Sequence, residues 1–585
     1  MNLNNRYILA GVLAVIVLTL FSYRGVYSSG FIWDDDDLVT ENYDLRSVDG
    51  LKRIWTEPAS QLQYYPMTFT SFWIEYQLWR DAPAGYHLVN VFLHVINAFL
   101  VWLILVRLKV PGAFLAAIVF AVHPVHVETV AWISERKNLL STVFYLLSML
   151  SFVKYFGVGK GGALAHKKNT ALYFLALLFY CFALFSKTVT LSLPVVLLLI
   201  LWWKNRTVEP GQVLRIVPML VIGIVLGWLT VSIERYQMGE IGRSWSLLMI
   251  ERFLIAGNAV WFYIGKLIYP VNLSFVYTQW DISLERSYPG LLAAAAAVVV
   301  FALFRKKKNM PAVGTGLLFF LITIFPALGF FDVETMTYTF VADHYQYLAS
   351  VGLIALFSGG CVTMIGKSPR WRVVLYIILG MYISWLSVLT VQQVKIYKNK
   401  IALYTDTIEK NPGCWMAYHN RAVEYSQKRE FGLALDDLRQ AIVLNPRYYQ
   451  AFNTRGNVHS AIGQYADAMG NYNRSLVMDP SFAVAYVNRG SLFARSGNLT
   501  LALGDLNRAI EIRPKLAMAY VRRAEVYMRL KKFDEALADY DRALMIVPDA
   551  DFIYRSRDLF YEVMRGQKEK DSVKSKMKEF CKGRL

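Results

Sequence analysis

Four consecutive carboxylates, Asp34–Asp37, are the residues whose type and spacing most directly suggest chemistry. They follow an apolar segment at residues 8–23, and the aromatic residues Phe31 and Trp33 come just before them. Aromatic side chains settle at the membrane–water interface, so we expect the cluster to lie where the chain leaves a bilayer. A run of acids is usually a solvated loop. A carboxylate anchored at the interface could instead act as a general base toward an acceptor hydroxyl.

A second polar segment interrupts the apolar sequence further along the chain. Its ionisable residues are His123, His126, Glu128, Glu135, Arg136 and Lys137. Ionisable groups at bilayer depth are costly, so they tend to mark a function. The two histidines would share one face of a helix. Such a pair is more often hydrogen-bonded at the interface than bound to a metal.

Two more polar positions stand at the ends of apolar segments: Lys187, and His344 within Asp343–Tyr345. Together with Arg136 and Lys137 they could hold the phosphate or diphosphate of a lipid. The alternative is that these cations are anchors that snorkel to the interface.

Long apolar runs before residue 393 must position these groups, and 56% of all residues are hydrophobic. The runs predict an all-α, multi-pass membrane domain over residues 1–393. The formal net charge of +19 does not indicate nucleic acid, because many Lys and Arg residues stand at helix ends as topology signals or face anionic lipid. The predicted spans after 8–23 lie at about 87–106, 112–131, 138–157, 170–186, 188–203, 214–232, 288–304, 312–331, 345–366 and 371–391.

Basic loops between the spans predict which groups share a side of the membrane. They place the first external loop, 28–85, on the outer face together with the second polar segment. The segment 248–268 begins with Glu251 and Arg252, and we read it as a re-entrant or interface-lying helix. This gives about eleven crossings of roughly 20 residues each, with everything after residue 393 outside.

The second half of the chain is a repeat. Prolines 412, 446, 480, 514 and 548 are each 34 residues apart, and small residues recur in register between them. This period predicts a tetratricopeptide repeat (TPR) solenoid over 394–551, with about four repeats, and a capping helix with a basic tail over 552–585. Such an array binds an extended peptide or another protein, or docks a second copy of the chain. The candidate acceptor-binding residues are Tyr418, Asn420, Asn453, Asn488 and Arg489.

Several motifs resemble the transmembrane-and-TPR (TMTC) proteins, in particular their bacterial relatives in the GT-C class of glycosyltransferases. The matching motifs begin at Phe31 (Phe-Ile-Trp-Asp-Asp), Tyr64 (Tyr-Tyr-Pro-Met-Thr), Pro83 (Pro-Ala-Gly-Tyr-His-Leu-Val-Asn), His123 (through Ser141), Ser186 (Ser-Lys) and Ala342 (Ala-Asp-His-Tyr-Gln-Tyr-Leu). The segment from His123 to Ser141 is the most specific of them. The resemblance covers nearly the whole chain.

The resemblance implies a glycosyltransferase that takes a sugar from a polyprenyl phosphate or diphosphate carrier. The base would be Asp34 or Asp35, while Asp36 and Asp37 receive no role. Donor binding would fall to His123, His126, Glu128, Glu135, Arg136, Lys137, Lys187 and His344. The family pattern has arginine where His344 stands, so that role could be pH-sensitive here or could belong to another cation.

The resulting expectation is an enzyme of the bacterial inner membrane with its TPR domain in the periplasm. Its partners would be the lipid-linked sugar, membrane lipid and an acceptor protein or peptide. Four carboxylates could also hold Mg²⁺ or Mn²⁺, but no ligand spacing identifies a metal. The alternative function is non-enzymatic: a membrane-anchored TPR scaffold for an envelope complex.

Overall fold

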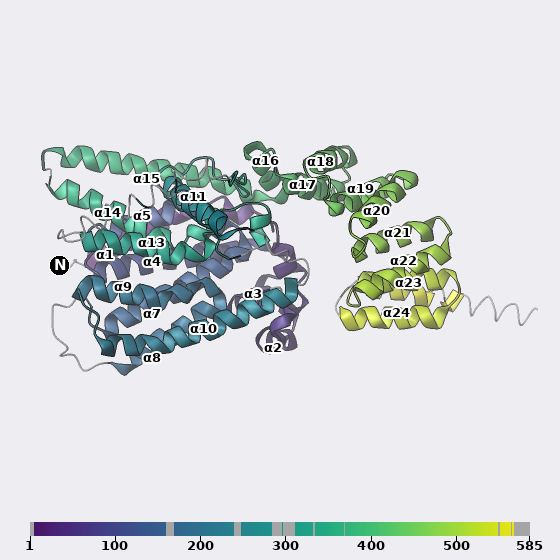
Figure 1. Cartoon of the computed structure of the whole chain (residues 1–585), viewed down its shortest axis with the longest axis horizontal. Coiled ribbons are helices and arrows are strands. Elements are labelled where there is room, and N and C mark those ends of the chain that lie inside the picture. Colours follow the sequence, from purple (N-terminus) through teal and green to yellow (C-terminus); the bar gives the residue numbers. More distant parts are fainter. Residues whose placement is uncertain are drawn as a thin grey trace, which may run out of the picture. The chain divides into compact units, whose positions relative to one another are not determined.

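The computed structural model describes residues 5–566 apart from 62, 159–168, 239–246, 283–289, 291–294, 296–309, 332–333, 368, 548–549, 551 and 563. Every regular element in these ranges is a helix (Figure 1), as predicted. The internal contacts divide the chain between Gly413 and Cys414 into two compact units. The first unit therefore includes helix α16 (Lys400–Lys410), which lies beyond the boundary at 393 that we predicted from the sequence.

The first unit has the long apolar helices of a multi-pass membrane protein. In the described ranges, six helices are long and apolar enough to cross a bilayer. They are Pro83–Arg107 (α4), Ile133–Tyr155 (containing α7, Arg136–Tyr155), Thr188–Asn205 (containing α9, Leu193–Asn205), Pro210–Ile233 (in α10, Pro210–Met238), Ser350–Lys367 (α14) and Pro369–Lys398 (containing α15, Arg372–Val394). Shorter apolar helices are α1 (Asn5–Ser22), α8 (Thr170–Ser186) and α13 (Met310–Ile324).

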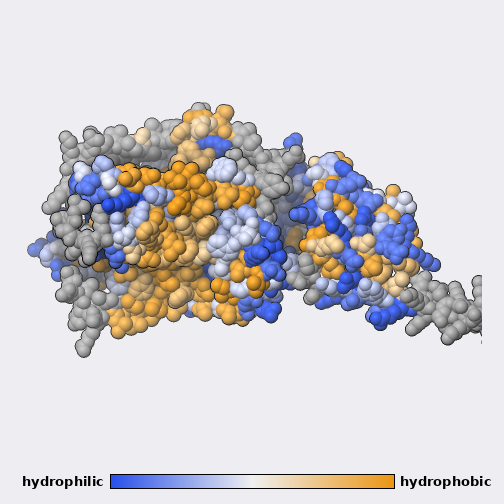
Figure 2. Space-filling model, turned by 90° about the horizontal axis from the view of Figure 1, so that it is seen from below, coloured by the Kyte–Doolittle hydropathy of each residue, from blue (hydrophilic) through white to orange (hydrophobic). Residues whose placement is uncertain are grey.

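One predicted span, 112–131, is broken. Its two parts, Ala113–Val122 and Pro124–Ala131, are bent by 56° at His123. Apart from residues 290 and 295, the predicted span 288–304 lies outside the described residues, and each of the others has a helix at its place. The segment predicted to be re-entrant contains helix α11 (Met249–Ile268). Trp228 on α10 is 71% exposed, and Figure 2 shows a broad hydrophobic face on this unit, as contact with lipid tails requires.

The first external loop folds into a small helical layer with its own core. Its helices are α2 (Val48–Thr56) and α3 (Pro66–Trp79). Leu38 and Val39, which directly follow the acidic cluster, are buried against Leu45 and Phe72 in this core. The layer therefore fixes one end of the acidic turn.

The second unit consists of helix pairs, which confirms the predicted TPR solenoid. The pairs are α17 (Trp415–Gln427) with α18 (Phe431–Leu444), α19 (Tyr449–Ala461) with α20 (Tyr465–Met478), α21 (Ala483–Arg495) with α22 (Leu499–Ile512), and α23 (Ala517–Arg529) with α24 (Phe533–Ile546). Small residues bring the paired helices together: Ala434 is fully buried, and a Cβ on Gly456 would lie 2.6 Å from the ring of Tyr472.

Candidate functional site

The acidic cluster lies in a tight turn after the first apolar helix. Trp33 has a φ of 49°, in the left-handed region that a bulky residue rarely adopts. The Asp35 amide donates to the Ile32 carbonyl at 2.9 Å, and the Leu38 amide donates to the Asp34 carbonyl at 3.0 Å. This backbone directs the four carboxylates to different partners.

Asp35 is fully buried and holds two segments together. One carboxylate oxygen accepts from the Ile32 amide at 2.9 Å. The other accepts from the Ser134 amide at 2.8 Å and from its hydroxyl at 2.5 Å. Burial and the neighbouring charge of Asp34 raise the pKa of Asp35 to about 8, against the effect of these donors. Asp35 therefore joins the acidic turn to the second polar segment.

Asp34 is partly exposed. Its Oδ1 accepts from the Trp132 indole at 3.0 Å. Loss of solvation raises the pKa of Asp34, and the positive charge of Lys137 opposes that rise. Asp34 thus combines partial access to solvent with a raised proton affinity, as a general base needs.

Glu135 lies between two lysines, Lys137 of α7 and Lys187, which directly follows the end of α8. The Lys137 ammonium is 3.2 Å from one oxygen of Glu135, and the Lys187 ammonium is 3.7 Å from the other. Asn138 donates to Glu135 as well and also donates to the His344 carbonyl at 3.0 Å. Two ammonium groups share one carboxylate, so this Lys–Glu–Lys cluster retains a positive charge beside the Asp34 carboxylate.

His344 joins the same cluster from a segment that lies 216 residues beyond Glu128 in the sequence. Its Nδ1 is 3.0 Å from Glu128, whose other oxygen accepts from the His344 amide at 3.0 Å. The Trp132 and His344 rings are in edge contact at 5.7 Å. The neighbouring Asp343 accepts from the Tyr277 hydroxyl at 2.8 Å. Burial and the charge of Glu128 raise the pKa of Asp343 to about 8.

Arg136 points away from this group and is fully buried. Its guanidinium forms a two-pronged ion pair with Glu75 and also donates to Asn90 and to the Tyr86 carbonyl. These contacts tie the second polar segment to α3 and α4. The sequence did not single out Glu75, which carries no local signal of this partnership.

The two histidines support the break in the helix. Nε2 of His123 is 3.0 Å from the Leu267 carbonyl. For His126, Nδ1 is 2.8 Å from the Phe120 carbonyl and Nε2 is 2.9 Å from the Ser350 hydroxyl. The predicted hydrogen-bonded histidines are thus present, and both are buried.

The remaining carboxylates do not converge with Asp34 and Asp35. Asp36 pairs with Lys400 of α16, and Asp37 is exposed. Among the described residues, no three His, Cys, Asp or Glu side chains are grouped as a metal site requires.

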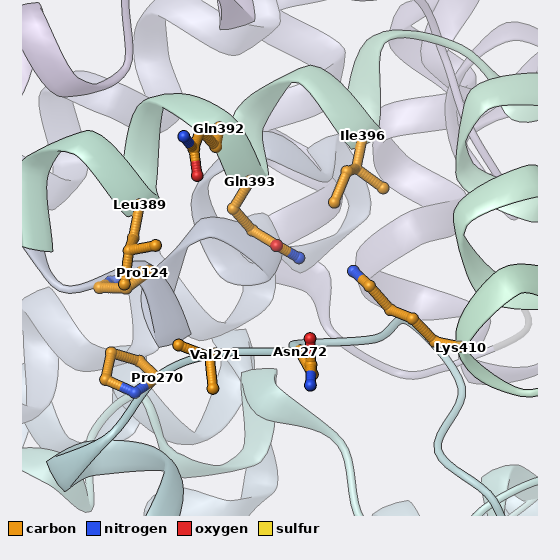
Figure 3. A pocket seen from close by; sticks show the side chains of 9 residues that line it. All are labelled: Pro124, Pro270, Val271, Asn272, Leu389, Gln392, Gln393, Ile396 and Lys410. Atoms are coloured by element: carbon orange, nitrogen blue, oxygen red, sulfur yellow. The ribbon is translucent and has the colours of Figure 1, made fainter.

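A cavity of about 260 Å³ opens elsewhere in the first unit (Figure 3). Its lining is Pro124, Pro270, Val271, Asn272, Leu389, Gln392, Gln393, Ile396 and Lys410. Figure 3 shows Gln393 of α15 and Lys410 of α16 on its walls. Both side chains donate to the Leu273 carbonyl, at 3.4 and 2.6 Å, so the polar groups of the cavity hold α15 and α16 to the non-helical segment around Leu273. No predicted donor-binding residue lines it.

In the second unit, the Arg489 side chain links the two helices of its own repeat. It forms a two-pronged ion pair with Asp505, both contacts at 2.8 Å, and the same pair recurs as Arg421–Asp437 and Arg523–Asp539. Asn488 donates to Asn453 of the preceding repeat at 2.9 Å. The Asn420 Oδ1 accepts from Nδ1 of the neighbouring His419 at 3.0 Å, and Tyr418 lies beneath the Arg421 guanidinium.

Sequence reasoning did not assign roles to Trp132, Asn138 or Tyr277. Trp132 and Asn138 stand inside the specific segment from His123 to Ser141, so their position was a usable signal. Tyr277 had none, because its partner Asp343 is 66 residues away in the sequence.

Comparisons with known proteins agree with both halves of the chain. Two family models described as tetratricopeptide repeat match residues 453–517 and 517–549. A protein O-mannosyl-transferase of Caenorhabditis elegans is 24% identical over 376 residues, which are 59% of this chain and 50% of that protein. Protein O-mannosyl-transferase TMTC3 of Mus musculus is 34% identical over 135 residues, covering 21% of this chain and 15% of that protein.

These relatives confirm the resemblance to TMTC proteins, although the chain spans about half the length of the first and less of the second. Among solved structures, YrrB, titled a TPR protein with an unusual peptide-binding site, is 21% identical, with a TM-score of 0.23 over 34% of this chain and 97% of that chain.

Proposed function

We propose that this chain is a GT-C type membrane glycosyltransferase that moves a sugar from a polyprenyl phosphate carrier to an acceptor, which is a protein bound by the TPR unit. The observation that carries the proposal is the partly exposed Asp34 carboxylate beside the buried Lys–Glu–Lys cluster. The names of the relatives make mannose the first sugar to test.

In this reaction Asp34 takes the proton of an acceptor hydroxyl. The hydroxyl oxygen attacks C1 of the sugar, and the bond from C1 to the phosphate oxygen breaks with its electron pair on the phosphate. Lys137 and Lys187 stabilise the charge that develops on this leaving group. Asp35, Arg136, His123 and His126 hold the two polar segments in place, because each is buried on protein partners.

Glu128, Glu135 and His344 complete the donor site in this proposal. Glu135 orients both lysines, and Glu128 fixes the ring of His344. We assign Asn420 and Asn488 to acceptor binding, whereas Tyr418, Asn453 and Arg489 support the repeats. The site lies at the outer face of a bacterial inner membrane, with the TPR unit in the periplasm.

Replacing Lys187 by methionine is expected to raise the KM for the lipid-linked sugar by about 10- to 100-fold. A hydrogen bond to a charged group contributes about 1.5–3 kcal/mol, and the variant loses one from the phosphate. The measurement is initial transfer rate against donor concentration in liposomes. Lys154→Met is the matched control, since Lys154 is exposed at the far end of α7 from Lys137. Equal donor KM values in the two variants would remove Lys187 from the site.

The pH dependence of transfer tests the base. Asp34 must be ionised, and loss of solvation raises its pKa. Activity should therefore fall as the pH drops through a value above the ordinary range for aspartate. Lys137→Met removes the cation that most lowers the pKa of Asp34, so the fall in activity at low pH should begin at a higher pH in this variant. The midpoint of that fall should move less in Lys187→Met. An unchanged midpoint in Lys137→Met contradicts Asp34 as the titrating group.

A further inference from the structure

Helix α16 is the last element of the first unit, and both of its ends are fastened to that unit. Just before it, the Lys398 carbonyl accepts from the Gly30 amide at 2.9 Å. Its first residue, Lys400, forms an ion pair with Asp36 of the acidic turn. At its other end, Lys410 donates to the Leu273 carbonyl at 2.6 Å and Asn411 donates to the Val276 carbonyl at 3.3 Å. The helix therefore spans from the acidic turn to the 273–276 segment.

A row of aromatic rings connects α16 to the carboxylate of Asp34. The rings of Tyr404 and Trp33 are 6.3 Å apart, and Trp33 is 5.2 Å from Phe275. Phe275 is in turn 5.3 Å from Trp132, which donates the hydrogen bond to Asp34. The left-handed backbone of Trp33 is a conformation that persists only where surrounding contacts hold it. Tyr404 and Phe275 supply such contacts.

We propose that α16 is a positioning element for the general base, with Lys400 and Tyr404 as its positioning residues. The inference rests on the proposed function. It also gives a role to Asp36, to which we assigned none from the sequence: its ion pair with Lys400 holds the acidic turn. Lys400 fixes the residue two places after Asp34, and Tyr404 fixes the residue before it. The second unit begins at Cys414, so the helix that orients the base is also the one from which the TPR array continues.

The test compares full-length variants in liposomes. Tyr404→Ala removes the ring without changing any charge, and Lys400→Met removes the ion pair. Each should lower kcat by about 10- to 100-fold, since small displacements of a catalytic group have effects of this size. The donor KM should stay within about twofold of wild type, because a displaced base slows the chemical step without weakening donor binding. Tyr404→Phe keeps the ring and should retain activity.

A charge reversal separates positioning from loss of charge. Asp36→Lys and Lys400→Asp should each be impaired, whereas the double variant should recover most of the lost kcat. Asp37→Asn is the control, because Asp37 is exposed and adjacent. Hydrogen exchange gives a readout besides activity: the amides of Asp35 and Leu38 should exchange faster in Lys400→Met than in Asp37→Asn.

The outcomes distinguish this inference from the function on which it rests. An inactive wild type overturns the proposed function, and the exchange rates then decide whether α16 holds the turn. An active wild type together with unimpaired Tyr404→Ala and Lys400→Met variants overturns the inference alone. A double variant no better than its single variants also overturns it.

Discussion

Replacing Asp34 by asparagine is expected to reduce the rate of sugar transfer by about 10²- to 10⁴-fold, the usual contribution of a general base. Asparagine keeps an oxygen that can accept from the Trp132 indole, as Asp34 does at 3.0 Å, so the turn should keep its shape. The side chain can no longer take a proton from the acceptor hydroxyl. The measurement is the single-turnover rate with saturating donor, together with the melting temperature of the purified chain.

The controls for this prediction come from the same turn. Asp37→Asn changes an exposed neighbour and should leave the rate within about twofold of wild type, as surface changes usually do. Asp35→Asn should lower both rate and stability, because its amide group would face the Ile32 amide that Asp35 now accepts from at 2.9 Å. Full activity in both Asp34→Asn and Asp35→Asn, and in the double variant, would exclude both carboxylates as the base.

Replacing Glu75 by glutamine is expected to lower the free energy of unfolding by about 3–5 kcal/mol, because it leaves the charge of Arg136 buried without a counter-ion. Arg136 is fully buried and Glu75 is 4% exposed, so water cannot replace the lost partner. Solvent-exposed pairs contribute only about 0–1 kcal/mol. Arg53→Met, which breaks the ion pair of Arg53 with Asp44 where the arginine side chain is 40% exposed, should therefore have a much smaller effect.

Unfolding of the full chain in detergent, followed by loss of helical signal, measures this difference. A combined Glu75→Leu and Arg136→Leu variant should be more stable than Glu75→Gln, because an apolar pair leaves no unpaired charge. If Glu75→Gln and Arg53→Met are equally stable, the buried pair does not hold the second polar segment against α3.

The repeat and the apolar spans could be predicted from sequence because their signals are periodic and local. The 34-residue spacing of Pro446 and Pro480 located helix pairs whose small residues, such as Ala434, are buried as expected. The break at His123 was missed: His123, Pro124 and Glu128 interrupt the apolar run from 112 to 131, but these residues were interpreted as a functional segment within one span. Proline removes a backbone donor and is compatible with either a helix start or a kink.

The sequence predicted which residues lie in the site better than it predicted what each of them does. The sequence named Glu135, Lys137 and Lys187, which lie together. The sequence could not show that Arg136 and Lys137 have different partners. Arg136 forms an ion pair with Glu75, whereas Lys137 forms one with Glu135. Adjacent residues differ here because partners come from distant segments: Ser134 lies 99 residues from Asp35. Which neighbour is buried depends on tertiary packing, which spacing along the chain does not encode.

The most direct test of the account is transfer of radiolabelled mannose from polyprenyl-phosphate-mannose to proteins. The full-length chain is reconstituted in liposomes and supplied with an envelope-protein extract of its source cells. The account predicts protein-bound label with wild type and with Asp37→Asn, and almost none with Asp34→Asn. The contradicting result is equal labelling by wild type and Asp34→Asn, or donor that stays intact in the presence of the wild-type chain.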